Sequence, residues 1–145
     1  MENGTDCLLI EDAMSMHSKM PMKQIYSCVV CTKDKFYIVP TKSVGMFVIF
    51  NTIKNHAFFE GMTIPQGLNK MISETETAEE LDTKLSELLE NNENYIHTLA
   101  DAKSVKIKGF LGKKTLTMRQ GGTWASFSPK KKQAGKDLAA FYPNY

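Results

Sequence analysis

The sequence predicts an α+β protein: a strongly bent antiparallel sheet, closed at one end by a C-terminal helix, with a helical insertion between two groups of strands. Residues 104–128 alternate apolar and polar side chains with a period of two, as half-buried strands do. Residues 77–91 instead repeat leucine at helical spacing, which is typical of an amphipathic helix. We therefore expect one domain over residues 1–145, with residues 63–95 as the insertion.

Length and composition suit one intracellular domain. The chain has 145 residues and 42% hydrophobic content, enough for a sizeable core. Its three cysteines, an odd number, argue against a disulfide framework and favour a reducing compartment. The first residues are acidic where a signal peptide is basic, and the longest apolar run, residues 46–50, is far shorter than the ~20 residues of a membrane span. We expect a cytoplasmic protein without a transmembrane segment.

Charge is divided unequally along the chain. Residues 1–100 hold 8 Lys and Arg against 14 Asp and Glu, whereas residues 101–145 hold 10 against 2, so the net charges are −6 and +8. A basic segment of this kind commonly contacts phosphates or an acidic surface. The two charged parts can instead face each other within one monomer or dimer, and the sequence leaves both interpretations open.

The first half of the chain predicts a group of strands. Residues 5–10 are a candidate first strand, and the β-rich runs at 24–31 and 35–40 are joined by a loop short enough for a hairpin. Residues 44–50 predict a further strand with two apolar faces, which residues 57–59 extend. Cys28 and Cys31 have the spacing of a redox or zinc motif, but residues three apart on a strand point to opposite faces, so we expect no metal site.

The middle of the chain predicts two helices. Residues 64–72 suit a short helix, and Thr77 with Glu80 makes a capping box before a longer one. The apolar stripe of this longer helix must bury against the sheet or against a partner, which makes its leucines candidate protein-interaction residues: Leu81, Leu85, Leu88 and Leu89. Eight acidic residues and one lysine between positions 74 and 93 give the helix a negative opposite face.

The last third of the chain predicts three consecutive strands and a closing helix. Ser128 suits the N-cap and Pro129 the first position of a helix that runs to about residue 142. Three lysines at 130–132 would then occupy its first turn, where each opposes the helix dipole by about 0.3–1 kcal/mol. Because lysines at these positions destabilise the helix, we expect that they are retained for a purpose other than stability.

The basic residues of this region are candidate anion-binding residues, because lysines and free helix N–H groups both favour phosphate. The set is Lys106, Lys108, Lys113, Lys114, Arg119, Lys130, Lys131 and Lys132. Alternatively, these side chains are simply solvated. Nucleic acid is a poor candidate ligand, because single-strand binders expose aromatic residues among basic ones, whereas Trp124 and Phe127 are expected to be partly committed to the core.

Three segments carry a family resemblance. Residues 31–40, Cys-Thr-Lys-Asp-Lys-Phe-Tyr-Ile-Val-Pro, look like a second hairpin, and residues 97–107 resemble the segment that feeds later strands. The final Gly-Gly-Thr-Trp-Ala-Ser-Phe-Ser and the helix after it are similar to a last strand and closing helix. The chain thus resembles the pleckstrin-homology-like superfamily, and within it the bacterial PH and GRAM-type domains. It departs from them at Lys35, where arginine is usual, and in the insertion at residues 63–95.

The resemblance implies the binding of phosphoinositides, peptides or other domains, although fold alone is weak support for a function. No nucleophile elbow, phosphate-binding loop or dinucleotide fingerprint is present, so we expect a non-enzyme without a cofactor. The leading hypothesis is a non-catalytic binding module whose basic C-terminal surface contacts a lipid headgroup or an acidic protein. Such a module can lie at the periphery of a membrane. The alternative is a structural or interaction domain that docks or forms a homo-oligomer through helix 77–91.

Overall fold

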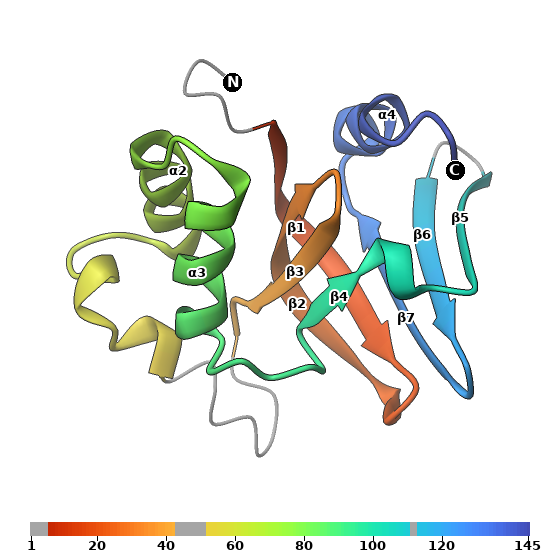
Figure 1. The fold of residues 1–145 in the computed structure, drawn as a ribbon, viewed down its shortest axis with the longest axis horizontal. Helices are drawn as coiled ribbons and strands as arrows, with labels where there is room; N and C mark the ends of the chain where they lie inside the picture. Colours follow the sequence, from red (N-terminus) through yellow and green to blue (C-terminus); the bar gives the residue numbers. More distant parts are fainter. Residues whose placement is uncertain (1–5, 43–51, 111–112) are drawn as a thin grey trace.

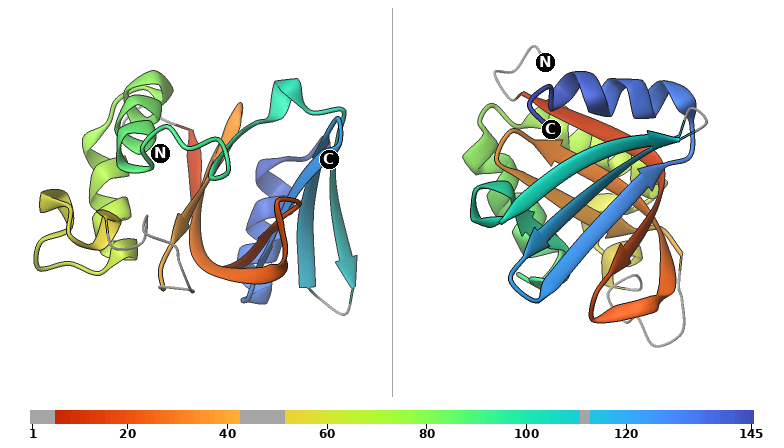
Figure 2. Two further views of the ribbon diagram at one scale, coloured as in Figure 1. Left: turned by 90° about the horizontal axis from the view of Figure 1, so that it is seen from below. Right: turned by 90° about the vertical axis from the view of Figure 1, so that its right-hand side faces the viewer.

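The computed structural model describes residues 6–42, 52–110 and 113–145, and seven strands in these ranges form one antiparallel sheet (Figure 1). The strand order is β4-β3-β2-β1-β7-β6-β5. The sheet curls into a half-barrel, with two helices packed on one side and the C-terminal helix across one end (Figure 2). The predicted α+β class is therefore confirmed, including the bent sheet, the C-terminal helix and the helices between the two strand groups.

The seven strands are β1 (Cys7–His17), β2 (Met20–Thr32), β3 (Lys35–Pro40), β4 (Ile96–Thr98), β5 (Ser104–Phe110), β6 (Lys113–Gln120) and β7 (Thr123–Pro129). β1 pairs with both β2 and β7, and so joins the N-terminal strands to the C-terminal ones. The hairpin of β2 and β3 and the meander of β5, β6 and β7 confirm the two strand groups. The first strand runs seven residues beyond its predicted end, and the strand predicted at residues 44–50 lies outside the described residues.

The helices between the strand groups are α2 (Ile64–Glu74) and α3 (Ala78–Leu88). Both begin at a threonine N-cap: the Thr63 hydroxyl accepts from the Gln66 amide at 3.2 Å, and that of Thr77 from the Glu80 amide at 3.1 Å. The predicted helices are confirmed. Residues 57–59, however, do not extend a strand as predicted but form a 3₁₀ turn that the His56 ring caps.

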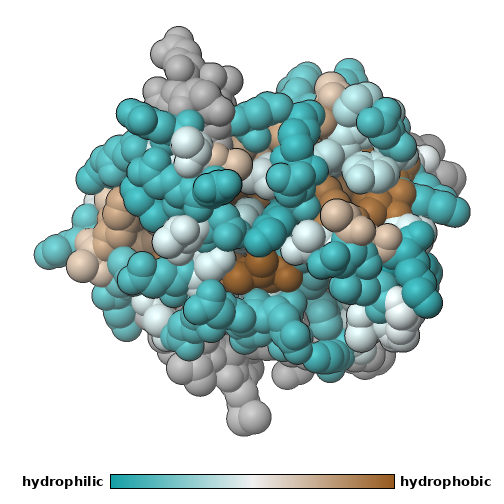
Figure 3. Space-filling model, viewed as in Figure 1, coloured by the Kyte–Doolittle hydropathy of each residue, from teal (hydrophilic) through white to brown (hydrophobic). Residues whose placement is uncertain are grey.

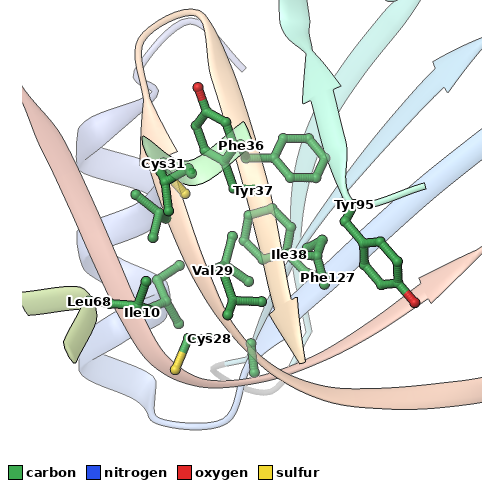
Figure 4. Packing of buried hydrophobic residues seen from close by; sticks show 14 of the residues in the cluster. Ile10, Cys28, Val29, Cys31, Phe36, Tyr37, Ile38, Leu68, Tyr95 and Phe127 are labelled. Carbon is green, nitrogen blue, oxygen red and sulfur yellow. The ribbon is translucent and has the colours of Figure 1, made fainter. Parts of the chain in front are cut away.

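Strand β3 is covered on both faces, because successive side chains point to opposite sides of a sheet. Phe36 packs inside the half-barrel against Phe127 of β7, with ring centroids 5.0 Å apart (Figure 4). Tyr37, the next residue, donates its hydroxyl to Asp82 of α3 at 2.6 Å. This arrangement explains why the run from Phe36 to Val39 is entirely buried. It also places α2 and α3 on the side of the sheet that faces away from β5 and β6 (Figure 1).

The leucine stripe of α3 lies inside the molecule. Its members are 0–2% exposed and belong to the hydrophobic core: Leu81, Leu85, Leu88 and Leu89. The sequence predicted that this stripe is buried either against the sheet or against a partner, and in the structure it is buried within the fold of the chain itself. In this conformation the four side chains offer a partner almost no surface, and what α3 presents to solvent is its charged face.

The C-terminal helix α4 (Lys132–Phe141) begins three residues later than predicted. Ser128 and Pro129 belong instead to β7, where they pair with Met14 and Ala13 of β1. The Ser128 hydroxyl donates to the Lys114 carbonyl at 2.9 Å and is not used as a helix cap. Long-range strand pairing therefore overrides the local helix-start pattern, and of the lysines at 130–132 only Lys132 lies in the first helical turn.

Candidate functional site

The outer faces of β5 and β6 gather basic side chains. Directly opposed residues share a face of a sheet, and the register pairs Lys106 with Thr117, Lys108 with Thr115 and Ser104 with Arg119. Lys113 lies at an alternate position of β6 on the same face. The apolar residues between these positions point into the half-barrel, toward the core. We call the four cations Lys106, Lys108, Lys113 and Arg119 the basic face.

Three of the four cations of the basic face line a hollow of about 320 Å³, whose lining is Ser104, Lys106, Lys108, Thr117 and Arg119. All four cations of the face are exposed. Among the described residues, no carboxylate lies within 4 Å of any of their charged groups. No helix covers these strands from outside (Figure 2). The hollow therefore combines unpaired cations with hydroxyl groups, which is a donor set suited to phosphate or carboxylate oxygens.

The other four candidate lysines do not join this face. Lys114 lies on the inner side of β6, where its stem passes between Gly109 and Gly135 of α4, and a Cβ on Gly135 would lie 3.1 Å from the Lys114 Cγ. Lys130 lies 3.9 Å from the Asp12 carboxylate and 4.4 Å from the centre of the Tyr26 ring. Lys131 is the N-cap residue of α4. The eight predicted residues therefore do not form a single site.

The positions of Lys130 and Lys132 predict opposite effects of charge reversal. Lys132→Glu is expected to stabilise the protein by about 0.3–1 kcal/mol, because it places an acid in the first turn of α4. Lys130→Glu is expected to destabilise it by up to about 1 kcal/mol, since a second carboxylate would lie beside Asp12 and the contact with Tyr26 would be lost. Thermal denaturation at low salt measures both. Changes in melting temperature of the same sign in the two variants would contradict a helix that begins at Lys132.

The acidic residues of α3 lie far from the basic face. α3 packs on the side of the sheet opposite β5 and β6 (Figure 1), and no ion pair within the described ranges joins it to residues 101–145. Asp82 instead pairs with Lys35 at 3.0 Å. Burial alone would raise its pKa, but hydrogen bonds from Tyr37 and Lys35 hold that pKa below its usual value. Among the described residues, Lys130 with Asp12 is the one ion pair that joins the two charged parts of the chain, so the acidic face of α3 and the basic face do not neutralise each other within the monomer.

The surface gives no sign of a broad apolar docking patch in the view of Figure 3. That face is mostly hydrophilic, and apolar side chains reach it only in small separated areas. Trp124 is half-buried and directly opposes Arg119, so it belongs to the outer side of the sheet, whereas Phe127 is 0% exposed. Of the two aromatic residues expected in the core, only Phe127 lies there fully.

Cys28 and Cys31, which have the spacing of a redox or zinc motif, are both fully buried. Burial raises the pKa of Cys28 to about 12 and also raises that of Cys31, so neither thiol is activated.

His17 and His97 lie together, with ring centroids 5.7 Å apart. No group of three or more metal-ligating side chains occurs in the part of the chain that the structure describes. The histidine pair has no local sequence signal, because its members lie far apart in the sequence, one on β1 and the other on β4.

No protein-family model, no curated protein and no solved structure matches the chain. Within the described ranges, no helix is both long enough and apolar enough to cross a membrane. What the chain can do must therefore be inferred from the arrangement of its own residues, in which the basic face gathers four exposed cations that have no ion-pair partner among the described residues.

Proposed function

We propose that the protein is a non-catalytic binding module that holds an anionic partner on its basic face, and that its half-barrel with a closing helix is a variant of the pleckstrin-homology-like fold. One observation carries the proposal: Lys106, Lys108 and Arg119 surround a hollow together with two hydroxyl side chains, and no carboxylate in the described chain pairs with them. Like charges that repel one another in the free protein gain most from a bound anion.

An anionic lipid surface is the partner that the position of the basic face favours. The face lies on open strands that a flat surface can approach (Figure 2). The acidic side of α3 lies across the molecule, so the protein has a charge asymmetry that would orient the basic face toward a negative membrane (Figure 1). Trp124 lies beside Arg119 on this side, and tryptophan favours the interface between headgroups and water.

The test uses vesicles that contain phosphatidylserine, with phosphatidylcholine vesicles as reference. The double variant Lys106→Glu, Arg119→Glu is expected to bind at least roughly 30-fold more weakly than the wild type, because each cation near a charged bilayer contributes about 1 kcal/mol. Binding should also fall steeply as salt rises. Because Trp124 is the only tryptophan in the chain, its emission should shift to shorter wavelength when the wild type binds.

The matched control is Lys54→Glu, Lys84→Glu, which changes the net charge equally but places the reversals among the helices between the strand groups. This control is expected to keep most of the binding. Equal losses in the two double variants would mean that net charge alone attracts the protein to the vesicle. Unchanged binding of the Lys106→Glu, Arg119→Glu variant would reject the basic face as the site.

A second copy of the chain is the other candidate partner, because the acidic residues of α3 are exposed on the far side of the molecule from the basic face. In that case α3 would interact through its charged side and not through its buried leucines. Sedimentation at low salt distinguishes the two partners. Self-association that the Lys106→Glu, Arg119→Glu variant abolishes, without vesicle binding by the wild type, would favour the second copy.

A further inference from the structure

The end of the half-barrel opposite α4 contains a second hollow, of about 370 Å³. It opens between the edge strand β4 and the far ends of β6 and β7 (Figure 1). His17 of β1 and His97 of β4 line it together with the apolar side chains of Ile96, Met118 and Ala125. Its size falls in the range of small-molecule sites, which are common in the mouths of curled β-sheets. We call this hollow the mouth pocket.

The two histidines of the mouth pocket have different free nitrogens. The Lys19 backbone N–H donates to His17 Nδ1 at 3.0 Å, so that nitrogen carries no proton and Nε2 of a neutral ring is the donor. His97 Nε2 lies 3.1 Å from the Asn94 carbonyl oxygen, which can only accept, so Nε2 is protonated and Nδ1 is the acceptor. Burial lowers the pKa of both histidines, that of His97 to about 4, so both rings are neutral at pH 7.

Asn94 adds an unsatisfied acceptor to the same pocket. Its side-chain Oδ1 is buried and has no hydrogen-bond partner among the described residues. A buried polar atom without a partner is destabilising by about 1–3 kcal/mol, so a bound group that donates a hydrogen bond to it gains that free energy. The residues that line the pocket thus carry one imidazole donor, one imidazole acceptor and a second acceptor, together with apolar side chains.

The charges around the mouth pocket disfavour an anion. Lys19, the only cation among the lining residues, lies 3.4 Å from the Glu93 carboxylate. Asp101 adds a second negative charge to the rim. A phosphate or carboxylate would therefore meet more negative than positive charge, whereas an uncharged ligand would meet none of its own sign. The mouth pocket and the basic face differ in this respect, and their two hollows share no lining residue.

We propose that the mouth pocket binds an uncharged planar nitrogen heterocycle of one or two rings, of the kind found in nucleobases. Such a molecule has flat apolar faces for Ile96 and Met118, and its edge carries donors and acceptors side by side. An acceptor on that edge receives the His17 Nε2 proton, and ring or amino N–H groups donate to His97 Nδ1 and Asn94 Oδ1. Polyols lack flat apolar faces that could contact Ile96 and Met118, and hydrocarbon rings lack an edge with hydrogen-bond donors and acceptors.

The test titrates adenine, and separately uracil, into the full chain at pH 7.5 while NMR records the imidazole signals of its three histidines. The His17 and His97 signals are expected to shift saturably with at least one of these heterocycles. His56, which is exposed and caps a turn beside α2, is the internal control and should not shift. Benzene, which has the ring without the polar edge, and inorganic phosphate are expected to leave all three signals unchanged.

Two variants complete the test. His17→Phe keeps an aromatic ring but removes the donor, and it is expected to weaken binding at least tenfold; the His97 signal verifies that the pocket is still folded. The Lys106→Glu, Arg119→Glu variant is expected to bind the heterocycle as the wild type does, so this proposal and the basic face fail or succeed separately. No shift of His17 or His97 up to roughly 10 mM heterocycle, or an equal shift with benzene, would overturn the proposal.

Discussion

Replacing Leu85 with alanine is expected to lower the free energy of unfolding by about 2–5 kcal/mol, because the change removes buried methyl groups and leaves a cavity. Leu85 is 0% exposed and packs in the same core as the other leucines of α3. Core packing relaxes only partly around such a cavity, so the loss exceeds the transfer free energy of the removed atoms alone. Denaturation by urea, followed by circular dichroism, measures the effect.

The matched control for Leu85→Ala is Glu87→Ala, on the exposed face of the same helix. It keeps α3 in place and is expected to change the free energy of unfolding by no more than about 0.5 kcal/mol. The pair of variants also tests the interaction role that the sequence left open for the leucine stripe. If Leu85→Ala left the unfolding free energy nearly unchanged but abolished self-association, the leucines would be contacting a partner and the buried placement would be wrong.

Lowering the pH from about 6.5 to 4 is expected to destabilise the protein by about 3 kcal/mol through His97 alone. Burial lowers the pKa of His97 from 6.5 to about 4 in the folded state. Between these two values the unfolded chain binds more protons at this residue than the folded chain does, so the contribution is complete above pH 6.5 and is lost as the pH falls. The His17 ring, 5.7 Å away, opposes protonation of His97 further.

The replacement His97→Phe isolates this contribution. The new ring can keep the contact that His97 makes with Phe36, with centroids 4.9 Å apart, but it does not titrate. Its free energy of unfolding is expected to fall between pH 7 and pH 4.5 by less than that of the wild type, and the difference between the two slopes is the His97 contribution. His56→Gln, at an exposed position, is the control. Identical pH dependence in the wild type and His97→Phe would contradict the burial of a neutral histidine.

Much of the basic face was predictable because it depends on local periodicity. An alternating pattern at residues 104–108 and 114–119 places Lys106 and Lys108 on one side of a strand, and short links between the strands make them neighbours. Lys113 and Lys114 are consecutive, so alternation within one strand sends them to opposite faces. The register decides which face each has: it pairs Lys114 with Gly109 on the inner side beneath α4 and leaves Lys113 outside.

The start of the last helix shows where local patterns are insufficient. Ser128 followed by Pro129 is a good helix start in isolation, but the same residues gain backbone pairing with β1, about 115 positions earlier in the chain. This pairing moved Lys130 and Lys131 out of the first helical turn, and with them most of the dipole conflict that the sequence had suggested. A cap is worth about 1 kcal/mol, so several strand contacts are enough to override it.

By itself, the sequence determined the fold class, the division of charge, and the strands and helices whose periodicity repeats over several residues. Each of these depends on neighbours within one element, because side chains alternate along a strand and recur every three to four residues along a helix. Tertiary structure alone decided that the α3 leucines face the core, that Lys130 lies beside Asp12 and away from the basic face, and that His17 meets His97. These outcomes depend on how a curled sheet brings distant strands together, which no local spacing encodes.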